Sequence, residues 1–467
     1  MHLVGIGGSG MSGIAEVLVN LGYPVSGSDL AVNTSTRRLK KLGASVHKGH
    51  SAEHVRDADV VVISSAVKED NPEVIEARRR QIPVIPRAEM LAELMRLKHA
   101  VAIAGAHGKT TTTAMVAEVM TRGKLDPTVV IGGRVGKLRS GAKLGGGEMM
   151  VAEADESDGS FLKMKPTIAV VTNIDREHLD YYAGIDAIRE AFTTFLARVP
   201  FYGAAIVCTD DEHVRAILPH VDRKLITYGE NDAADVRAAA IEVHGFSTSY
   251  TAFAFGEELG KVALQLPGRH SVANSLAALA VGLELDVPFA TIAAALKGFR
   301  GVDRRLQLRG EAGGATVIDD YGHHPTEIRA TLEAIRAAFR GKLIVAFQPH
   351  RYSRTEALFQ EFAGSFGLAD VVLVTDIYPA GERPVPGVDG STIAHAIRRN
   401  GHPNVFYEAD KKNLPDRLRE LIEPGSIVLT LGAGDVWRAG DALVKQGDSR
   451  TGRRSGSGST KMEAVSR

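Results

Sequence analysis

The stretch Gly105-Ala106-His107-Gly108-Lys109-Thr110-Thr111-Thr112-Thr113 lies between an apolar run, residues 100–104, and a run compatible with a helix, residues 114–120. A strand, a glycine turn and a helix in this order aim backbone N–H groups and the positive end of the helix at a phosphate. Lys109 can neutralise terminal phosphates, and the Thr110 hydroxyl is placed to meet a magnesium ion. The loop is shorter than the common phosphate loop, and an ordinary turn can carry the same pattern. Nucleotide phosphate binding is the favoured interpretation.

Length and composition describe a large α/β protein. A chain of 467 residues is too long for one typical core and suggests roughly three domains of about 100–200 residues each. Its 56 basic and 56 acidic residues balance, so no global field draws it to nucleic acid or to an anionic membrane. The single cysteine, Cys208, excludes an intramolecular disulfide and fits a reducing cytoplasm. No apolar run approaches the roughly 20 residues that span a bilayer, and a signal peptide is not expected.

The first segment, residues 1–98, has the pattern of a dinucleotide-binding unit. Residues 2–6 form a predicted buried strand, and the turn Gly5-Ile6-Gly7-Gly8-Ser9-Gly10 follows at once. A predicted helix, residues 11–21, and a second strand, residues 24–28, lead to Asp29, nineteen residues beyond Gly10. Glycines in the turn allow close approach of a diphosphate, and the acid suits a ribose hydroxyl. The pattern predicts a Rossmann-like domain.

Two kinds of ligand fit this first turn. A glycine-rich turn binds the diphosphate of NAD as readily as that of a UDP-sugar. A dehydrogenase needs no separate Lys-Thr phosphate loop, so the stretch at residues 105–113 favours a substrate that itself carries a diphosphate. Ser64 and Ser65, at the end of a later strand, suit the same crevice or an ordinary turn.

Acidic residues gather at the end of a strand predicted over residues 148–152. The run Glu153-Ala154-Asp155-Glu156-Ser157-Asp158 is costly unless a cation offsets the repulsion, although a solvated acidic loop is an alternative. Another buried strand, residues 167–171, leads to His178. Because ligands of α/β sheets gather at the carboxyl ends of strands, we predict a magnesium site made of Thr110, Glu153 and His178.

The last part of the chain, residues 301–446, repeats the order of strand and polar loop. Four predicted strands, which end near residues 320, 347, 375 and 431, each lead into a charged or glycine-rich loop. This repetition predicts a second Rossmann-like domain with its crevice at those ends. Residues 447–467 are rich in Ser, Gly, Arg and Lys and are expected to form a disordered tail.

These separated motifs together resemble the Mur ligases, the ATP-dependent enzymes that build the stem peptide of peptidoglycan. The resemblance rests on residues 5–16, 105–111, 153–158, 173–180 and 268–274 and covers nearly the whole chain except the tail. It implies an α/β fold of three domains: residues 1–98 for the UDP-substrate, a central P-loop ATPase-like domain over residues 99–300 for ATP, and residues 301–446 for the amino acid. Two departures are Ala106, where relatives usually have threonine, and a helix at residues 186–199 that lacks the lysine several relatives carbamylate.

The resemblance and the loops above assign the site residues. Catalytic roles are expected for Lys109, Glu153, His178, His323 and Arg351. ATP is expected to contact Gly105, Ala106, His107, Gly108, Lys109, Thr110, Thr111, Asn274, Arg305 and Asp320. The other substrates are expected to contact Gly7, Gly8, Ser9, Gly10, Met11, Asp29, Ser64, Ser65, Tyr321, His323, Arg351, Arg354 and Tyr378. Magnesium is expected on Thr110, Glu153 and His178.

The implied reaction is an ATP-dependent amide ligation in peptidoglycan precursor synthesis. The motif at residues 7–13 resembles the branch that adds L-alanine to the lactyl carboxylate of UDP-N-acetylmuramate, through an acyl phosphate. The alternatives are a recycling ligase that adds a whole peptide to the same UDP-sugar, an NAD-dependent dehydrogenase and a non-catalytic nucleotide-binding module. A cytoplasmic monomer or homodimer is expected, with no nucleic-acid or membrane partner.

Overall fold

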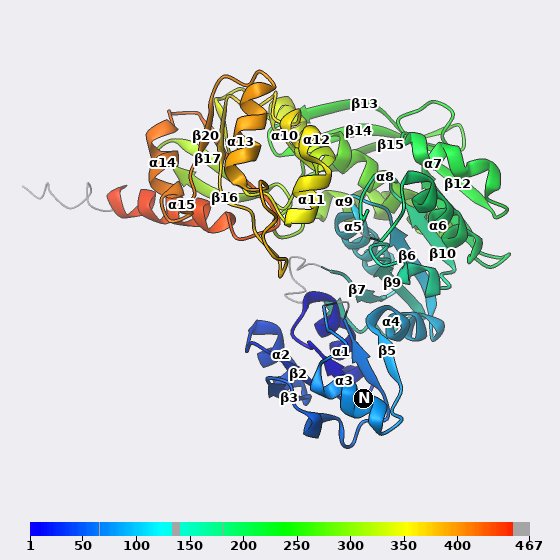
Figure 1. Ribbon diagram of the computed structural model, residues 1–467. Coiled ribbons are helices and arrows are strands. Elements are labelled where there is room, and N and C mark those ends of the chain that lie inside the picture. The colour runs from blue at the N-terminus through cyan, green and yellow to red at the C-terminus, as the bar shows by residue number, and fades with distance from the viewer. Residues whose placement is uncertain (65, 133–140, 180, 452–467) are drawn as a thin grey trace, which may run out of the picture. The chain divides into compact units, whose positions relative to one another are not determined.

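The computed structural model describes residues 1–64, 66–132, 141–179 and 181–451 (Figure 1). The chain divides into two compact units, Met1–Asp303 and Arg304–Arg467. The first unit contains two sheets and the second contains one, and strand pairing in all three is mostly parallel. The predicted α/β class is therefore confirmed. Among the described residues, none of the helices combines the length and apolar character needed to cross a membrane.

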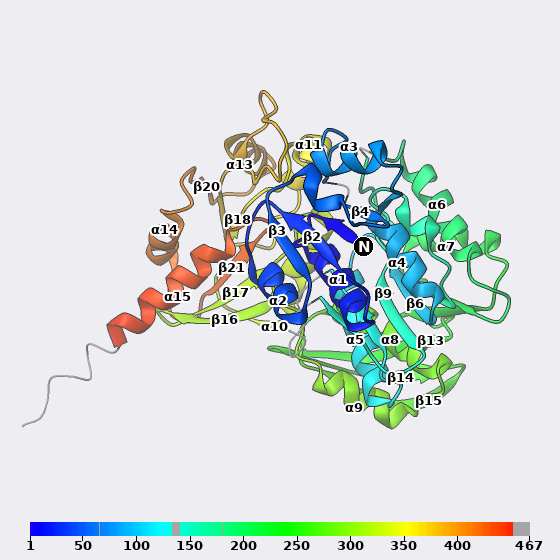
Figure 2. The same cartoon turned by 90° about the horizontal axis from the view of Figure 1, so that it is seen from below.

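The first sheet is parallel and has the strand order β3-β2-β1-β4-β5. Figure 2 shows β2 and β3 between helices α1 and α2 on one side and α3 on the other. Leu3 of β1 packs in the core with α1, α2 and α4, whereas its neighbour Val4 packs with η1 and α3, as alternation along a strand requires. The elements are β1 (His2–Val4), α1 (Ser9–Asn20), β2 (Ser26–Asp29), α2 (Thr34–Leu42), β3 (Ser45–Lys48), η1 (Ala52–Val55), β4 (Val61–Ile63), α3 (Pro72–Arg79), β5 (Val84–Pro86) and α4 (Arg87–Arg96).

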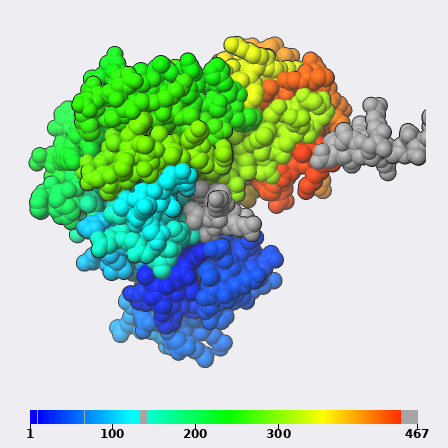
Figure 3. All heavy atoms as spheres, turned by 180° about the vertical axis from the view of Figure 1, so that it is seen from behind, coloured from blue at the N-terminus to red at the C-terminus, as the bar shows by residue number. Residues whose placement is uncertain are grey.

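The second sheet has ten strands in the order β15-β14-β13-β12-β11-β10-β6-β9-β7-β8. The strands that follow residue 203 continue this sheet, because β13 pairs with β12. In the space-filling view this part of the first unit is coloured cyan to green, and the part that holds the first sheet is blue (Figure 3). The strands are β6 (His99–Ala104), β7 (Thr128–Val130), β8 (Ala142–Lys143), β9 (Met149–Glu153), β10 (Ile168–Val171), β11 (Ala204–Cys208), β12 (Leu225–Gly229), β13 (Val236–His244), β14 (Ser247–Ala254) and β15 (Glu257–Leu264).

Helices cover both faces of the second sheet. Residues of α5, α8 and α9 share one apolar core with one face, and residues of η3 and α6 pack in the core on the other. Cys208, at the end of β11, is buried and unpaired, and burial raises the pKa of its thiol to about 12. The helices are α5 (Lys109–Arg122), η3 (Ser160–Lys163), α6 (Ile185–Ala197), α7 (Glu212–Ile217), η4 (Leu218–His220), α8 (Arg269–Glu284) and α9 (Phe289–Gly298).

The second unit is built on a six-stranded sheet in the order β16-β17-β21-β18-β19-β20. Only β16 runs antiparallel to its neighbour, β17, among the described strands of this sheet. Its elements are β16 (Gln307–Ala312), β17 (Ala315–Asp320), α10 (Pro325–Ala338), β18 (Leu343–Phe347), α11 (Tyr352–Ala357), α12 (Phe359–Ala363), β19 (Val371–Val374), α13 (Gly390–Arg399), β20 (Val405–Tyr407), α14 (Leu414–Leu421), β21 (Ile427–Leu431) and α15 (Trp437–Thr451).

The structure differs from two of the expectations. Helix α5 begins at Lys109 rather than near residue 114, so the threonine run lies within the helix. Helix α15 continues to Thr451, into the segment expected to be disordered, and residues 452–467 lie outside the described residues. The domain boundaries expected near residues 98 and 300 stay predictions.

Candidate active site

The predicted phosphate loop connects β6 to α5, and its backbone requires glycine at two positions. Gly105 has φ +131°, and a Cβ built on it would overlap with Thr172 Oγ1. Gly108 has φ +83°, and a Cβ there would lie 2.5 Å from Asn274 Oδ1. An L side chain rarely adopts either conformation. Gly108 is the N-cap of α5, so the positive end of this helix lies at the loop.

Polar residues after β10 hold the loop in place. Asn173 accepts hydrogen bonds from the backbone N–H of Ala106 (3.2 Å, at its carbonyl) and of His107 (2.8 Å, at Oδ1). The side chains of Thr172 and Asn173 donate to the His107 carbonyl at 2.6 and 3.0 Å. The His107 ring nitrogen Nε2 lies 2.9 Å from Asp175 Oδ2. Asn173 and Asp175, at the start of the motif at residues 173–180, thus support the loop.

Lys109, the first residue of α5, is held over the loop that precedes it. Its Nζ donates to the Gly105 carbonyl (2.6 Å), the Ala106 carbonyl (3.2 Å) and Glu156 Oε1 (2.7 Å). Burial opposes its charge, but the surrounding carboxylates, Glu156 first among them, outweigh burial and raise the pKa of Lys109. Lys109 is therefore a permanent cation at the point where phosphates are expected.

Two carboxylates at the end of β9 are buried with unused acceptor capacity. The Thr110 side chain forms a hydrogen bond with Glu153. Glu153 Oε1 and Glu156 Oε2 are buried without a hydrogen-bond partner among the described residues. Burial raises the pKa of both carboxyls, that of Glu156 to about 7 in spite of Lys109. Lys109 keeps its charge because several carboxylates surround it. Glu153 and Glu156, whose pKa values are raised, bind a proton more readily than exposed carboxylates do.

His178 lies beside Glu156 and Glu177. Its Nε2 is 3.9 Å from Glu156 Oε1 and 3.9 Å from Glu177 Oε2, and ligand atoms of the three residues lie within 4.8 Å of one another. His178 has φ +55°, a value that is uncommon for a non-glycine residue. Glu156, which belongs to the acidic run but not to the predicted metal set, thus lies beside His178, and the set of Thr110, Glu153 and His178 stays a prediction.

The chemistry of these donors fits a magnesium ion. Carboxylate and hydroxyl oxygens are its preferred protein ligands, and two or three of them suffice because the ion keeps several waters. The two buried oxygens without partners, on Glu153 and Glu156, offer negative charge that a divalent cation would offset. Thr110, Glu153 and His178 remain the expected ligands.

The first turn of the chain closes on Asp29. Its carboxylate accepts hydrogen bonds from the backbone N–H groups of Gly7 (2.9 Å) and Ala31 (3.0 Å). Asn33 Nδ2 donates to the Gly7 carbonyl at 3.1 Å. Gly8 is exposed and is the N-cap of α1, which begins at Ser9. Asp29, which is expected to contact a ribose, therefore also stabilises the turn.

An arginine that the sequence analysis did not single out lies beside Gly10. A Cβ on Gly10 would lie 2.6 Å from Arg87 Nη1, and Arg87 Nη2 pairs with Asp155 at 3.1 Å. A guanidinium therefore links the first turn to the acidic run at the end of β9. Met11 packs in the core with only 2% of its surface exposed, so its backbone alone is available to a ligand.

The remaining residues predicted in the first unit have mixed positions. Ser64 Oγ lies near Gly5, 3.7 Å from the point where a Cβ would stand, and Ser65 lies outside the described residues. Asn274 is buried on α8 and accepts a hydrogen bond from Thr112 Oγ1 (3.1 Å), so it lies directly behind Gly108. Thr111 is half-buried in the first turn of α5.

In the second unit, aromatic and imidazole rings gather at the carboxyl ends of β17, β18 and β19. The ring centroids of Tyr321 and His323 are 5.4 Å apart, and those of His323 and His350 are 5.6 Å apart. His350 stacks on Tyr378 at 5.6 Å, with 7° between the ring planes. The structure thus brings together the predicted Tyr321, His323 and Tyr378 and adds His350, to which the sequence analysis gave no role.

Arginines surround this ring cluster. The guanidinium carbons of Arg304 and Arg305 each lie 5.0 Å from the centre of the Tyr321 ring. Arg354 Nη1 lies 3.3 Å from His350 Nδ1. Arg351 has φ +69°, and its Nε is 3.6 Å from Glu382 Oε1. Fixed cations next to this cluster of aromatic and imidazole rings suit a ligand that carries a carboxylate.

Asp320 and Arg305, both expected to contact ATP, have partners within the second unit. The Asp320 carboxylate accepts from the backbone N–H groups of Leu306 and Gly322, each at 2.8 Å, and burial raises its pKa to about 6. Arg305 Nη1 lies 3.3 Å from Glu327 Oε1. Asp320 therefore stabilises the turn after β17. A contact of Asp320 or Arg305 with ATP stays a prediction.

We expect the stability of the protein to depend on the protonation of His350. Burial, reinforced by the positive charges of His323, Arg354, Arg351 and Arg304, lowers the pKa of His350 from 6.5 to about 3. As the pH falls below about 6.5 the unfolded chain takes up the proton first, so stability is lost on acidification between these values. Urea unfolding measured from pH 7.5 to 4.5 should show a smaller decrease in the free energy of unfolding for His350→Gln than for the wild type. An identical slope in both proteins would contradict the assignment.

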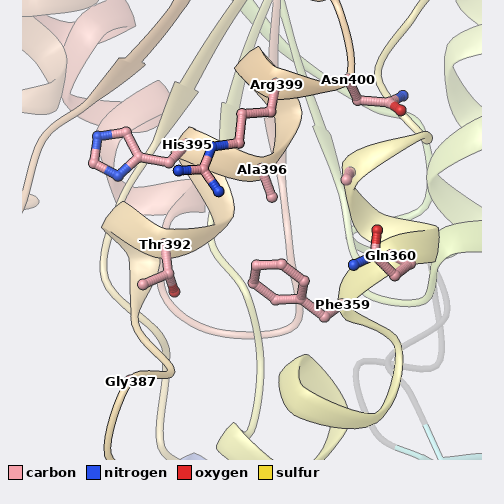
Figure 4. A pocket seen from close by; sticks show the side chains of 9 residues that line it. Phe359, Gln360, Gly387, Thr392, His395, Ala396, Arg399 and Asn400 are labelled. Carbon is pink, nitrogen blue, oxygen red and sulfur yellow. The ribbon is translucent and has the colours of Figure 1, made fainter.

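One cavity of about 450 Å³ in the second unit lies apart from these residues, between α12 and α13 (Figure 4). Phe359, Gln360, His395 and Arg399 are among its lining residues, and none of the predicted site residues lines it. Because it lies on the helices and not at the strand ends, it is not part of the candidate site.

Known protein families match all three parts of the chain. Residues 1–99 match the Mur ligase family, catalytic domain, residues 103–282 the Mur ligase middle domain, and residues 304–434 the Mur ligase, glutamate ligase domain. The predicted fold of three domains is thereby confirmed.

Individual relatives cover nearly the full length of the chain. A UDP-N-acetylmuramate–L-alanine ligase of Geobacter sp. (strain M21) is 56% identical over 445 residues, which are 95% of this chain and 96% of the relative. The crystal structure of a UDP-N-acetylmuramate–alanine ligase from Thermotoga maritima is 30% identical, with a TM-score of 0.80, and covers 96% of this chain and 99% of its own. A murein peptide ligase from Psychrobacter arcticus shares the fold, with a TM-score of 0.69 and 23% identity over 97% of this chain and 98% of its own. This chain therefore belongs to the Mur ligase family.

Proposed function

We propose that this protein joins L-alanine to the lactyl carboxylate of UDP-N-acetylmuramate and converts ATP to ADP and phosphate. The single observation that carries the proposal is the 56% identity, over nearly the whole length of both chains, to a ligase of that name. The glycine loop with its permanent cation supports an ATP site, and the arginine-flanked ring cluster of the second unit supports binding of a carboxylate.

The reaction has two chemical steps. The lactyl carboxylate attacks the γ-phosphorus of ATP, which releases ADP and leaves an acyl phosphate. The amine of alanine then attacks the acyl carbon, phosphate leaves, and the amine loses a proton. Negative charge builds on phosphoryl oxygens in the first step, so positioning and fixed positive charge supply most of the catalysis.

Named residues of this chain have distinct tasks in those steps. Lys109, held over the loop, faces the charge that develops on the phosphates. Thr110, Glu153 and His178 would hold a magnesium ion, which when bound neutralises and orients phosphate oxygens. Gly7, Gly8 and Gly10 belong to the turn that would receive the diphosphate of the UDP-sugar, and Arg87 lies beside Gly10.

The second unit is proposed to bind the amino acid and the muramoyl carboxylate. Arg351 and Arg354 present guanidinium groups beside the ring cluster, and a guanidinium binds a carboxylate at two points. His323 is a candidate base for the amine proton. A cytoplasmic location remains part of the proposal, and the oligomeric state, monomer or homodimer, stays open.

An assay of phosphate release tests the proposal and its rivals together. With ATP, magnesium and UDP-N-acetylmuramate, we expect L-alanine to support turnover well above that with L-serine, glycine or the tripeptide. Preference for the tripeptide would identify the recycling ligase instead. Turnover of NAD without ATP would identify a dehydrogenase, and ATP binding without amino-acid-dependent phosphate release would identify a binding module.

A further inference from the structure

A carboxylate is fully buried in the part of the protein that holds the first sheet. Glu73, in the first turn of α3, has no exposed surface. Its carboxylate accepts a hydrogen bond from Ser28 Oγ (2.6 Å) and lies 3.0 Å from His50 Nδ1 and 2.7 Å from His54 Nδ1. His2 Nε2 approaches it to 3.5 Å. One carboxylate therefore connects β1, the end of β2, the segment after β3, and η1.

The charge of Glu73 is maintained in spite of its burial. Burial by itself would raise the pKa of Glu73, but the nearby His2 ring and the hydrogen bonds with Ser28 and His54 outweigh burial and hold the pKa at about 2. Asn71 caps α3 by accepting from the Glu73 backbone N–H at 2.9 Å, and a carboxylate in the first turn of a helix is favoured. Well-packed apolar side chains are often as stabilising as a buried charged group. Stability alone therefore does not explain why a charged carboxylate is buried here.

The contacts of Glu73 lead directly to the glycine turn. The carbonyl of Ser28 accepts hydrogen bonds from Gly5 N (2.8 Å) and Ile6 N (3.0 Å), the residues with which the turn begins. Ser28 precedes Asp29, whose carboxylate holds Gly7 N. His50 follows Gly49, whose N–H donates to the Asp29 carbonyl at 2.9 Å. Ser28 is thus the chain neighbour of Asp29, and His50 is the chain neighbour of Gly49, which is hydrogen-bonded to Asp29.

We propose that Glu73 is a positioning residue for the UDP-sugar: by holding Ser28 and His50 it fixes the turn at Gly5–Gly10 and Asp29 in the geometry that binds the diphosphate and ribose. This inference rests on the proposed function. Glu73 itself is buried and does not touch the substrate.

Three variants test this role through the kinetic constants of the separate substrates. In Glu73→Gln, which keeps the size of the side chain but removes its charge, we expect the KM for UDP-N-acetylmuramate to rise about tenfold. The KM for ATP, the KM for L-alanine and kcat should stay within about twofold. Ser28→Ala cuts the same connection from the other end and should give a rise of the same kind. In the double variant the rise should be no larger than in the stronger single variant, because both changes break one connection.

Glu16→Gln is the matched control. Glu16 is also a buried carboxylate of this part of the protein, 5% exposed, but it pairs with Arg38 of α2. We expect this variant to lower the melting temperature without a selective change in the KM for the UDP-sugar. Glu73→Gln with unchanged KM values, or with equal losses for all three substrates, would overturn the proposal. If Glu73→Gln does not fold, the KM values of Ser28→Ala test the proposal instead. Ser28→Ala is expected to fold because Glu73 keeps its contacts with the histidines.

A binding measurement separates failure of this inference from failure of the proposed function. Calorimetric titration with UDP as the probe, without ATP, should give a dissociation constant about tenfold weaker for Glu73→Gln than for the wild type. Equal affinity in the two proteins would overturn the inference. A wild type that binds UDP but forms no product from UDP-N-acetylmuramate would instead overturn the proposed function.

Discussion

Lys109→Ala is expected to lower the formation of ADP in the presence of UDP-N-acetylmuramate and L-alanine by about 10²- to 10³-fold. The loop carbonyls of Gly105 and Ala106 and the carboxylate of Glu156 hold the Lys109 ammonium at the loop, where we expect phosphoryl charge to develop. Loss of one fixed positive group from such a site typically costs two or three orders of magnitude in rate, about 3–4 kcal/mol. Steady-state measurement of ADP release gives the rate, and titration with UDP-N-acetylmuramate should show unchanged affinity.

Lys163→Ala is the control for this experiment. Lys163 is a half-exposed lysine of the same unit that pairs with Glu89 at 2.6 Å, and its exposed ion pair contributes at most about 1 kcal/mol. We expect wild-type activity from it. Wild-type turnover in Lys109→Ala would contradict the assignment of the loop as the ATP site.

Gly105→Ala should be the most damaging single methyl addition in the phosphate loop. The new Cβ would overlap with Thr172 Oγ1, and φ +131° is unfavourable for any L side chain. Strain and overpacking each cost about 1–3 kcal/mol, so we expect a loss of about 3 kcal/mol or more in the free energy of unfolding. Nucleotide binding should be lost as well, because Thr172 also holds the His107 carbonyl. Urea unfolding and ATP titration measure the two effects.

Gly43→Ala separates backbone strain from steric overlap. Gly43 caps α2 with φ +108°, and a Cβ there would meet no atom within 4 Å. Its replacement should cost only the backbone strain, about 1–2 kcal/mol, and leave nucleotide binding unchanged. Equal losses in the two variants would show that the contact with Thr172 is unimportant.

The sequence predicted those parts of the fold that have a strong local signal. Apolar runs at β1, β6 and β10 were found because buried parallel strands are apolar on both faces. Helix α2 and strand β3 were not predicted, because only Thr36 and Leu39 of α2 are buried and β3 is largely exposed. With two leucines in α2 and one valine in β3, these elements offer too few apolar residues for a period to be read from them alone.

The candidate site could be predicted only where it follows a strand in the sequence. Lys109, Glu153 and His178 come shortly after apolar runs, so their position at one edge of the sheet follows from parallel pairing. Arg87 lies beside Gly10 and Asp155 although it is far from both in the sequence. Contacts of this kind depend on how the elements pack, which periodicity and spacing do not specify.

The state of Cys208 has a practical consequence for labelling experiments. Its thiol is buried at the end of β11, and burial holds its pKa near 12, so thiolate-directed reagents have almost nothing to react with at neutral pH. The chain contains no other cysteine. A cysteine introduced on the surface of each unit would therefore carry a fluorophore or spin label without a background signal. The unmodified sequence is thus a ready starting point for measuring how far the two units move when substrates bind.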